Sequence, residues 1–330
     1  MRRHRNRWRD LVVRLSPADD GFPDYSDELL HDRAALVTRQ NIAFSSWSPT
    51  DASGACPTDL VDRYAWRVPD NIMDLVPRAI REVLGVLELP LVVLRNLDLV
   101  ELFAGRARIT RWATCAKLIA MPIDRTHCPH MDILLPDGLA IAVVSVLRTK
   151  PGGLVFAGPQ CSSWIWMTRK VTKRTKHIIL GDTSVACVQE GNEVNRCVVL
   201  LCYLAWRLGV YWVVEQPQAT LFFETQMMQH LISESAAKTV SINLGDYGHE
   251  TVKPTRLVGT APMLDELKAA TPARLRPTTG KRKRLFVAVR REDGKVRIHG
   301  RKEAMRASQA YPIKFARVVC ERHYPSSFVV

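Results

Sequence analysis

The sequence predicts an α/β fold built on a doubly wound, mostly parallel sheet. Short apolar segments that end in turn residues alternate with helical patterns between residues 97 and 244. Strands that alternate with helices at this spacing form parallel sheets covered on both faces. The content of 47% hydrophobic and 24% charged residues is ordinary for a soluble globular protein, so the chain can bury a core of this size.

The order of these segments gives the elements of the sheet. Apolar runs of strand length alternate with longer segments of helical periodicity, and a long apolar helix precedes the fourth run. We expect strands at residues 97–103, 120–124, 153–157, 210–215 and 239–244, and helices at 109–119, 139–147, 185–208 and 224–237.

The segments on either side of this pattern have a different composition. Residues 16–54 combine Asp, Pro and Ser with little periodicity, which is typical of loop or disorder. After residue 245 the pattern loosens into a hairpin at 284–299 and a last helix at 313–322. We therefore expect a partly disordered N-terminal extension at 1–90, a central domain at 91–245, and a small basic C-terminal region at 246–330.

The N-terminus carries five Arg in its first ten residues, with no apolar segment behind them. This is not a secretory signal; an organelle transit segment, a nuclear basic cluster and a solvated tail stay open. No apolar run reaches the ~18 residues that a membrane span needs, so we expect no membrane partner. We expect an intracellular monomer, nuclear rather than organellar.

The eight cysteines form no CxxC pair, which favours reduced intracellular thiols over a disulfide framework. The run His127-Cys128-Pro129-His130 matches no standard zinc spacing and has no partner pair. We predict no metal site.

The charge is strongly basic and unevenly spread. The net charge is +14, and residues 245–330 hold 19 Lys and Arg against 8 Asp and Glu. A basic surface near a candidate site favours nucleic acid as a partner, and a solubilising face is the alternative. The candidate nucleic-acid contacts are Arg169, Lys170, Lys173, Arg174, Arg256, Lys281, Arg282 and Lys283.

The first strand leads into a turn that could approach a nucleotide-like cofactor. Glu101-Leu-Phe-Ala-Gly105 places a glycine between a strand and a helix N-terminus, and Asp124 ends the next strand about 20 residues later. An acid at that place can accept hydrogen bonds from ribose hydroxyls. A plain α/β turn without a cofactor remains the alternative.

Two reactive residue types follow later strands. Cys161 comes after the third strand through a Gly158-Pro159 turn, and Glu215 ends the fourth. A thiol and a carboxylic acid at neighbouring strand ends can serve as nucleophile and acid/base, although a cysteine in this place can also be an inert core residue. Trp164 and Trp166 fit either base stacking or packing.

These motifs, taken in order, carry a resemblance to a known family. Leu-Phe-Ala-Gly, then Ile-Asp, then Gly-Pro-Gln-Cys-Ser-Ser-Trp, then Val-Val-Glu-Gln-Pro resemble the cytosine-C5 DNA methyltransferases over residues 98–257. The resemblance implies a Rossmann-like methyltransferase fold, S-adenosyl-L-methionine as cofactor and methyl transfer to C5 of cytosine, in DNA rather than RNA. Cys161 would add to C6 of the base and Glu215 would hydrogen-bond N3. Cofactor contacts would come from Glu101, Phe103, Ala104, Gly105, Asp124, Asp132 and Pro159.

The chain departs from the family pattern at several positions. Ala107 replaces the second glycine of the turn, Gln160 replaces a proline, and Gln216-Pro217 replaces Asn-Val. The arginine motif that braces the pyrimidine is not recognisable, and Arg256 is the nearest candidate. These departures keep open a catalytically silent nucleic-acid-binding module, and a methyltransferase for another substrate.

Overall fold

The structure is a computed structural model that describes residues 65–67, 70–76, 92–249, 251–270, 286–290, 296–300 and 309–328. Most of the predicted N-terminal extension lies outside these residues, as do Lys281, Arg282 and Lys283. The chain divides into two compact units, 1–63 and 64–330, and the described residues all belong to the second.

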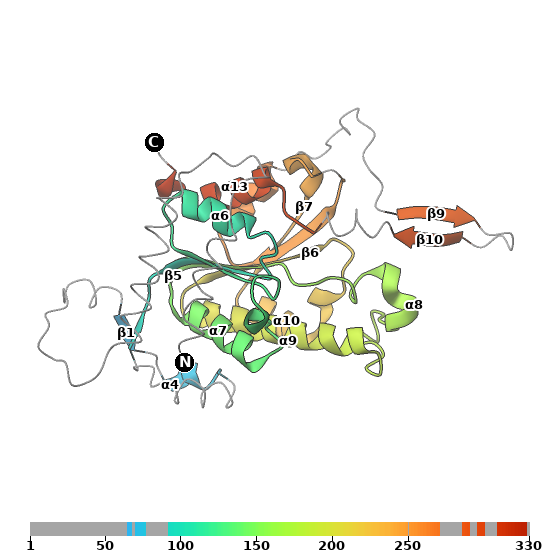
Figure 1. Ribbon diagram of the computed structural model, residues 1–330, viewed down its shortest axis with the longest axis horizontal. Helices are drawn as coiled ribbons and strands as arrows, with labels where there is room; N and C mark the ends of the chain where they lie inside the picture. Colours follow the sequence, from blue (N-terminus) through green and yellow to red (C-terminus); the bar gives the residue numbers. More distant parts are fainter. Residues whose placement is uncertain are drawn as a thin grey trace, which may run out of the picture. The chain divides into compact units, whose positions relative to one another are not determined.

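The described part is a mixed α/β fold with a six-stranded, mostly parallel sheet (Figure 1). The strand order is β4-β3-β5-β6-β8-β7, and β8 alone runs antiparallel to its neighbours. The strands are β3 (Leu97–Leu102), β4 (Ala120–Ile123), β5 (Thr149–Ala157), β6 (Tyr211–Pro217), β7 (Lys238–Asn243) and β8 (Pro254–Gly259).

Helices cover both faces of this sheet (Figure 1). One face carries α6 (Arg108–Cys115), α11 (Met263–Ala270) and α13 (Ile313–His323), and the other carries α7 (Pro136–Leu147), α9 (Ala186–Arg207) and α10 (Gln226–Glu234). The short helix α8 (Arg169–Thr172) lies beyond the first turns of α9. Single 3-10 turns are η1 (Pro129–Met131), η2 (Trp166–Thr168), η3 (Phe222–Glu224), η4 (Leu244–Tyr247) and η5 (Pro325–Ser327).

Two antiparallel strand pairs stand apart from the main sheet. The strands β1 (Ala65–Arg67) and β2 (Val92–Leu94) pair with each other, and α4 (Asp70–Met73) lies between them in sequence. The strands β9 (Phe286–Arg290) and β10 (Val296–Gly300) pair in register, which confirms the predicted hairpin.

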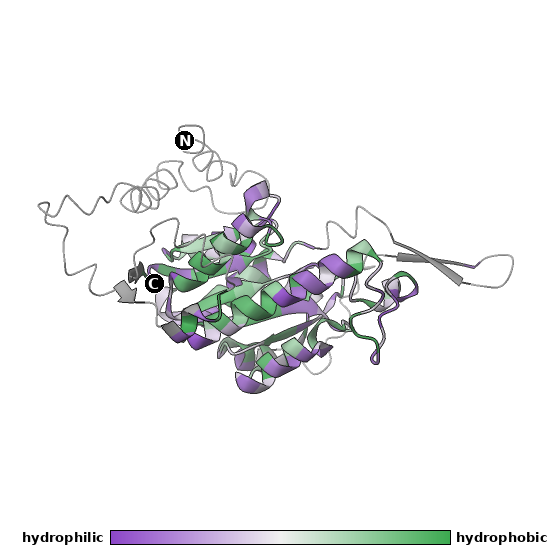
Figure 2. Ribbon diagram, turned by 90° about the horizontal axis from the view of Figure 1, so that it is seen from below, coloured by the Kyte–Doolittle hydropathy of each residue, from purple (hydrophilic) through white to green (hydrophobic). Residues whose placement is uncertain are grey.

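The core lies against the apolar central strands of the sheet. Leu99, Phe156 and Val213 on three neighbouring strands are fully buried, and they share one cluster with Phe315 and Val319 of α13. Figure 2 shows the same division, with hydrophilic residues along the outward sides of the helices and hydrophobic residues at the sheet. Burial of apolar surface of this kind is the main force that holds such layers together.

The strand β8 changes the domain organisation expected from the sequence. It lies between β6 and β7, and Leu257 within it is fully buried. The core cluster also includes Tyr311 and Phe315, far beyond residue 245. The main sheet and its core therefore extend across the boundary that the sequence analysis placed at 245.

Within the described residues, no helix combines the length and the apolar character needed to cross a lipid bilayer.

Candidate functional site

The turn after β3 has an unusual backbone. Phe103, Gly105 and Ala107 all adopt left-handed φ values, of 57°, 53° and 51°. Only glycine takes this conformation freely, so Phe103 and Ala107 cost roughly 1 kcal/mol or more each. A Cβ built on Gly105 would meet no atom within 4 Å, so the turn is open on that side.

Asp124 braces this turn from the end of β4. Its Oδ2 accepts a hydrogen bond from the Gly105 N–H at 2.9 Å, and its Oδ1 accepts from the backbone and hydroxyl of Thr126 at 2.8 and 2.6 Å. His127 Nε2 also lies 2.5 Å from the Gly105 carbonyl oxygen. The carboxylate remains partly exposed, and a carboxylate oxygen can accept more than one hydrogen bond.

Glu101 was expected to contact the cofactor, but its side chain points into the protein interior. Its side chain is 1% exposed, and its Oε2 accepts hydrogen bonds from the backbone and hydroxyl of Thr110, at 2.8 and 2.6 Å. The helix α6 has no capping side chain at its own N-terminus, so Glu101 supplies that cap from the preceding strand. Burial raises the pKa of Glu101 to about 7. The carboxylate thus has almost no surface left for a ligand.

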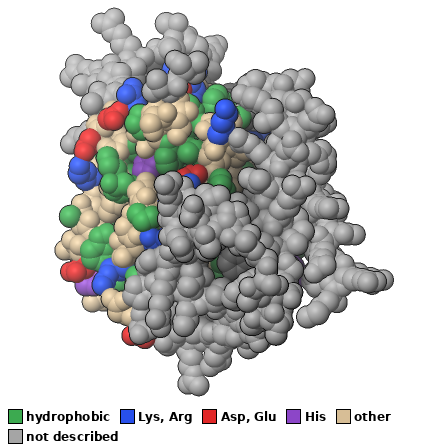
Figure 3. Space-filling view, turned by 90° about the vertical axis from the view of Figure 1, so that its left-hand side faces the viewer, with side chains coloured by type: hydrophobic (Ala, Val, Ile, Leu, Met, Phe, Trp, Pro, Cys, Tyr) green, Lys and Arg blue, Asp and Glu red, His purple; other side chains and the backbone are tan. Residues whose placement is uncertain are grey.

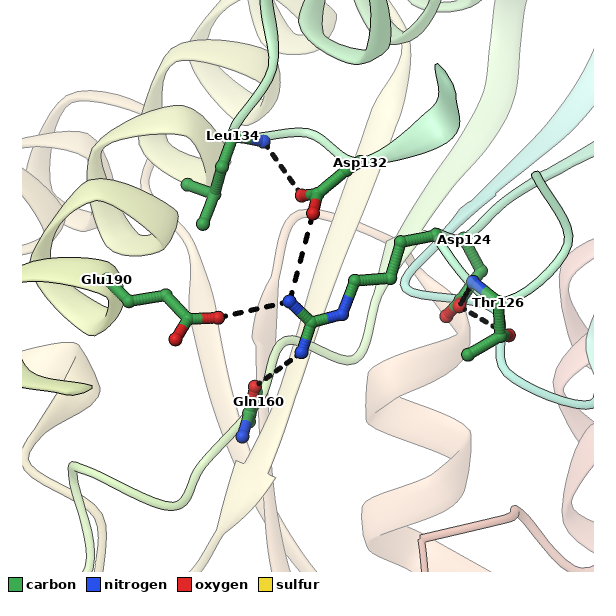
Figure 4. A network of polar contacts seen from close by, with 7 residues as sticks. Asp124, Thr126, Asp132, Leu134, Gln160 and Glu190 are labelled. Carbon is green, nitrogen blue, oxygen red and sulfur yellow. Dashed lines mark hydrogen bonds and ion pairs between the residues drawn. The ribbon is translucent and has the colours of Figure 1, made fainter. Parts of the chain in front are cut away.

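Asp132 belongs to a network of polar contacts (Figure 4). Its Oδ1 accepts a hydrogen bond from the Leu134 N–H at 3.1 Å, and its Oδ2 lies 3.8 Å from the guanidinium of Arg125. Arg125 also pairs with Glu190 at 3.1 Å and reaches Gln160 at 3.5 Å. The network therefore ties the loop that carries Cys161 to the beginning of α7.

The loop between β5 and Cys161 is fixed by two contacts. The Gln216 Nε2 donates a hydrogen bond to the Pro159 carbonyl oxygen at 2.5 Å, and both residues are buried. Gly158 faces the Tyr311 hydroxyl so closely that an added Cβ would fall inside van der Waals contact. Gln216 thus holds the loop before Cys161 in place.

Two contacts bring the loop that carries Cys161 beside the strand that carries Glu215. Gln216, next to Glu215, donates a hydrogen bond to the Pro159 carbonyl oxygen, and the Tyr311 hydroxyl lies against Gly158 as well as Glu215. The Tyr311 hydroxyl donates a hydrogen bond to Glu215 Oε2 at 3.2 Å. The second oxygen, Oε1, is buried and has no hydrogen-bond partner among the described residues. A buried unpaired oxygen of this kind is costly, so it needs a ligand or a functional explanation.

The Cys161 thiol is less acidic than an ordinary cysteine. Burial and then the charge of Glu215 raise its pKa to about 11, against the opposing charge of Lys253. Burial disfavours the thiolate because the charged form loses its hydration. The thiol is therefore protonated at neutral pH in the ligand-free protein.

Lys253 and Tyr311 are the site residues that the sequence analysis missed. The Lys253 ammonium lies 5.9 Å from the centroid of the Tyr311 ring and acts on Cys161. Lys253 lies in the loop before β8 and Tyr311 lies before α13, so both reach the site from beyond residue 245. Their local sequences are ordinary, and only the fold brings them to Cys161.

Arg256, the candidate for bracing the base, lies on β8 but binds elsewhere. Its guanidinium donates to Glu224 at 3.4 Å and to the Gln218 carbonyl oxygen at 3.1 Å. Among the described residues of the site, Lys253 is the cation whose charge acts on Cys161. Arg256 instead interacts with Glu224 and Gln218.

Arg174 was predicted to contact nucleic acid, but the structure places it in the interior. Its side chain is 1% exposed, lies 3.5 Å from the centroid of the Trp164 ring, and donates to the carbonyl oxygens of Ile179 and Val188 and to the Ser163 hydroxyl. It cannot contact a phosphate, so its predicted role in nucleic-acid binding is wrong. Arg169, Lys170 and Lys173 are exposed, and their predicted role stays open.

Trp164 is fully buried, which agrees with packing, whereas Trp166 is exposed.

Among the described residues, no group of three or more His, Cys, Asp or Glu side chains is placed to hold a metal ion. His127, Cys128 and His130 make separate local contacts in this region, with His127 on Gly105 and His130 on Asp137.

Comparison with models of known protein families finds no match for this chain, and comparison with curated proteins finds none either.

Proposed function

We propose that this chain is a methyltransferase with a Rossmann-like fold that uses S-adenosyl-L-methionine to methylate C5 of cytosine in nucleic acid. One observation carries the proposal: Glu215 presents a buried, unpartnered oxygen in the same site as the Cys161 thiol. Attack on C6 of a pyrimidine needs a nucleophile together with a hydrogen-bonding acid that faces the ring nitrogen.

The residues at the end of β3 and β4 fit such a cofactor. The turn at Gly105 has open space where a side chain would otherwise lie, so a ligand can approach its backbone closely. Asp124 and Asp132 keep part of their carboxylate surface exposed near this turn. We assign cofactor binding to Phe103, Ala104, Gly105, Asp124 and Asp132; Pro159 is buried and supports the adjoining loop, and Glu101 supports α6. When bound, the cofactor would supply an electrophilic methyl group on a sulfonium.

The chain's own groups then have distinct roles. The Cys161 thiolate forms a bond to C6, and the ring electrons move toward C5 and N3. Glu215 in its protonated form donates through its free Oε1 to N3, while Tyr311 holds Oε2. Lys253 offsets the negative charge that the ring gains. C5 would then form a bond to the methyl group that the bound cofactor supplies. A water molecule would take the C5 proton, the electrons of that C–H bond would re-form the C5–C6 double bond and expel Cys161 as thiolate, and N3 would return its proton to Glu215.

The high pKa of Cys161 limits when this reaction can begin. At neutral pH the thiol is protonated in the ligand-free protein, because burial and Glu215 oppose the charged form. Transfer of the thiol proton to the Glu215 carboxylate would produce, in one step, the thiolate that attacks C6 and the acid that donates to N3.

A direct test measures transfer of labelled methyl from S-adenosyl-L-methionine to cytosine-containing DNA and RNA. The wild type is compared with Cys161→Ala, Glu215→Gln and, as a matched control, Cys187→Ala at an exposed position. We expect loss of transfer in the first two variants and no change in the control. Equal transfer by wild type and Cys161→Ala would exclude Cys161 as the nucleophile.

Two observations favour a second function, nucleic-acid binding without catalysis. They are the raised pKa of the Cys161 thiol and the hydrogen bond of Arg125 to Gln160. Under this hypothesis the chain is a catalytically silent nucleic-acid-binding module with the same fold. Calorimetry with S-adenosyl-L-methionine separates the two hypotheses. Micromolar binding would contradict a silent module, whereas salt-sensitive binding of nucleic acid without cofactor binding would support it.

A further inference from the structure

The segment that follows the nucleophile loop forms an exposed basic arm, which we define as residues 165–181. It contains no Asp or Glu. Four of its five Lys and Arg side chains are exposed, namely Arg169, Lys170, Lys173 and Lys176, whereas Arg174 is buried. By contrast, acidic and basic side chains are interspersed in the described part of the face drawn in Figure 3, which is the left-hand side of Figure 1, away from α8.

The same arm exposes large apolar side chains. Of the exposed large hydrophobic residues among the described positions, more than half lie here: Trp166, Val171, Ile178 and Leu180, each between 47% and 59% exposed. Exposed apolar groups gathered within a few residues mark an interaction surface more often than scattered ones do.

These side chains are held outward by a built structure. The turn at Thr175 is closed by its own backbone N–H bond to the Ile178 carbonyl oxygen at 3.1 Å and by its hydroxyl, which accepts from the Ile178 N–H at 2.9 Å. Asn192 of α9 donates to the Leu180 carbonyl oxygen at 3.1 Å. Arg174 joins the arm to Trp164 and Val188. The exposure is therefore a property of the folded arm.

The chemistry of the partner follows from the two kinds of side chain. The arm itself holds no acid, and Asp182 just beyond its end acts on Lys173. The remaining excess of exposed cations matches a row of phosphates. Exposed aliphatic and indole groups match the flat apolar faces of nucleobases. A duplex hides those faces within its stack, whereas an unpaired strand presents them together with its phosphates. Charge complementarity and apolar exposure thus favour an unpaired strand.

We propose that the basic arm binds an unpaired nucleic-acid strand, with its cations on the phosphates and its apolar side chains on the bases. As a statement about the substrate of Cys161, this depends on the proposed function, because the arm begins four residues after that thiol in the sequence. As a statement about binding, it stands without catalysis.

The test measures binding of the full-length protein to fluorescein-labelled 20-nucleotide strands, as DNA and as RNA, and to the matching duplexes, by anisotropy at several salt concentrations. The apolar variant is Trp166→Ser with Ile178→Ser, and the charge variant is Lys170→Gln with Lys173→Gln. Leu135→Ser with Met227→Ser is the matched control, because these residues are similarly exposed outside the arm. Thermal melting of each variant verifies that it is folded.

We expect the wild type to bind the single strand at least tenfold more tightly than the duplex. The apolar variant should lose roughly tenfold on the single strand, as expected for contacts with one or two bases, and little on the duplex. The charge variant should lower the slope of log affinity against log salt by about 1.4, since each phosphate contact on a single strand contributes about 0.7. The control should bind as the wild type does.

Equal affinity for strand and duplex, or an equal loss in the control, would overturn the proposal. So would arm-dependent binding to vesicles of anionic lipid without binding to the single strand. Cys161→Ala distinguishes this failure from failure of the proposed function. If Cys161→Ala binds the strand normally and no protein transfers methyl, the arm proposal holds and the enzyme proposal fails.

Discussion

Glu101 is a single buried side chain that joins β3 to α6 and makes the stability of the fold depend on pH. It ends in the interior, where Thr110 satisfies one oxygen and the other, Oε1, has no partner among the described residues. The pKa of this carboxyl is about 7 in the folded protein against its ordinary value of 4.5. The folded state therefore keeps the proton over a range in which the unfolded chain loses it.

The sign of the pH dependence follows from that difference. The contribution of Glu101 to stability is present below about pH 4.5 and is lost as the pH rises through 7. Glu101→Gln keeps an acceptor for Thr110 and never ionises, so its stability relative to wild type should rise by up to about 3 kcal/mol from pH 4 to pH 8. Denaturant unfolding at the two pH values measures this change. Glu234→Gln, at an exposed position, should show no such trend, and a constant difference for Glu101→Gln would contradict the assignment.

The contact between Gly158 and Tyr311 gives a second prediction at this scale. Gly158→Ala would push a methyl group into the Tyr311 hydroxyl and should cost about 1–3 kcal/mol, the usual range for overpacking. In a Tyr311→Phe background the cost should be smaller, because the nearest atom is gone and the next lies at 3.2 Å. A double-mutant cycle by denaturant unfolding measures the coupling.

Gly248→Ala is the matched control for that cycle. A Cβ at Gly248 would meet nothing within 4 Å, so its cost should be independent of Tyr311. Additive free energies for Gly158→Ala and Tyr311→Phe would show that the hydroxyl does not limit this position.

Individual site residues were predictable to the extent that local sequence identifies them. Glu215 lies near the end of β6 and Cys161 comes four residues after β5, so their position at the ends of neighbouring strands could be predicted. Tyr311 and Lys253 could not, because their part in the site depends on contacts across more than 90 residues. Arg174 was wrongly predicted to bind nucleic acid, because a run of cations in the sequence does not show which side chain is buried.

At the scale of elements, the basic arm depends on that inward cation. Arg174 bonds two carbonyl oxygens and a hydroxyl and lies on the Trp164 ring, so it joins α8 to α9 through one side chain. Burial lowers the pKa of its guanidinium to about 10, so it stays charged at neutral pH. An arm of this kind needs a charged donor in its centre, since apolar residues cannot satisfy those acceptors.

Arg174→Met should loosen the arm while the sheet stays folded. Loss of charged hydrogen bonds to buried acceptors usually costs about 2–4 kcal/mol, and here the cost should be local. Hydrogen exchange should accelerate in residues 165–188 and remain unchanged in β3 and β5. Lys176→Met, at an exposed position of the same arm, is the control and should exchange as wild type does. Acceleration across the whole sheet would contradict a local role.

The boundaries of the elements show where sequence patterns reach their limit. The helix predicted at 109–119 ends at Cys115, because a turn follows in which Lys117 adopts a left-handed φ of 64°. The long helix α9 agrees with its prediction within a residue at each end. Apolar periodicity locates the middle of an element, but its end depends on single-residue conformations that the pattern does not encode.

At the scale of the whole molecule, the C-terminal segment is part of the same core as the sheet. Phe315 of α13 is fully buried against the rings of Phe156, Tyr311 and Tyr247. The fold class and five strands of the main sheet were predictable, because each is an apolar run of its own. The place and direction of β8 were not, because pairing between distant strands is not visible in a local pattern.

Phe315→Ala should therefore destabilise the sheet together with α13. Truncation of a buried Phe costs about 3–5 kcal/mol. Unfolding followed by circular dichroism and by tryptophan fluorescence, which includes the buried Trp212, should show one shared, lowered midpoint. Met227→Ala, at an exposed position, should change little. Separate midpoints for the two probes would support a boundary near residue 245 after all.

The position of β8 between β6 and β7 also has a consequence for the order of synthesis. When β7 leaves the ribosome it has no partner on its β6 side, because the strand that must separate them is made later. Its backbone groups stay unpaired until residues 254–259 emerge. Tyr311, which holds Glu215, is synthesised later still. A nascent chain thus carries its cysteine for some 150 residues of translation before the acid beside it is fixed.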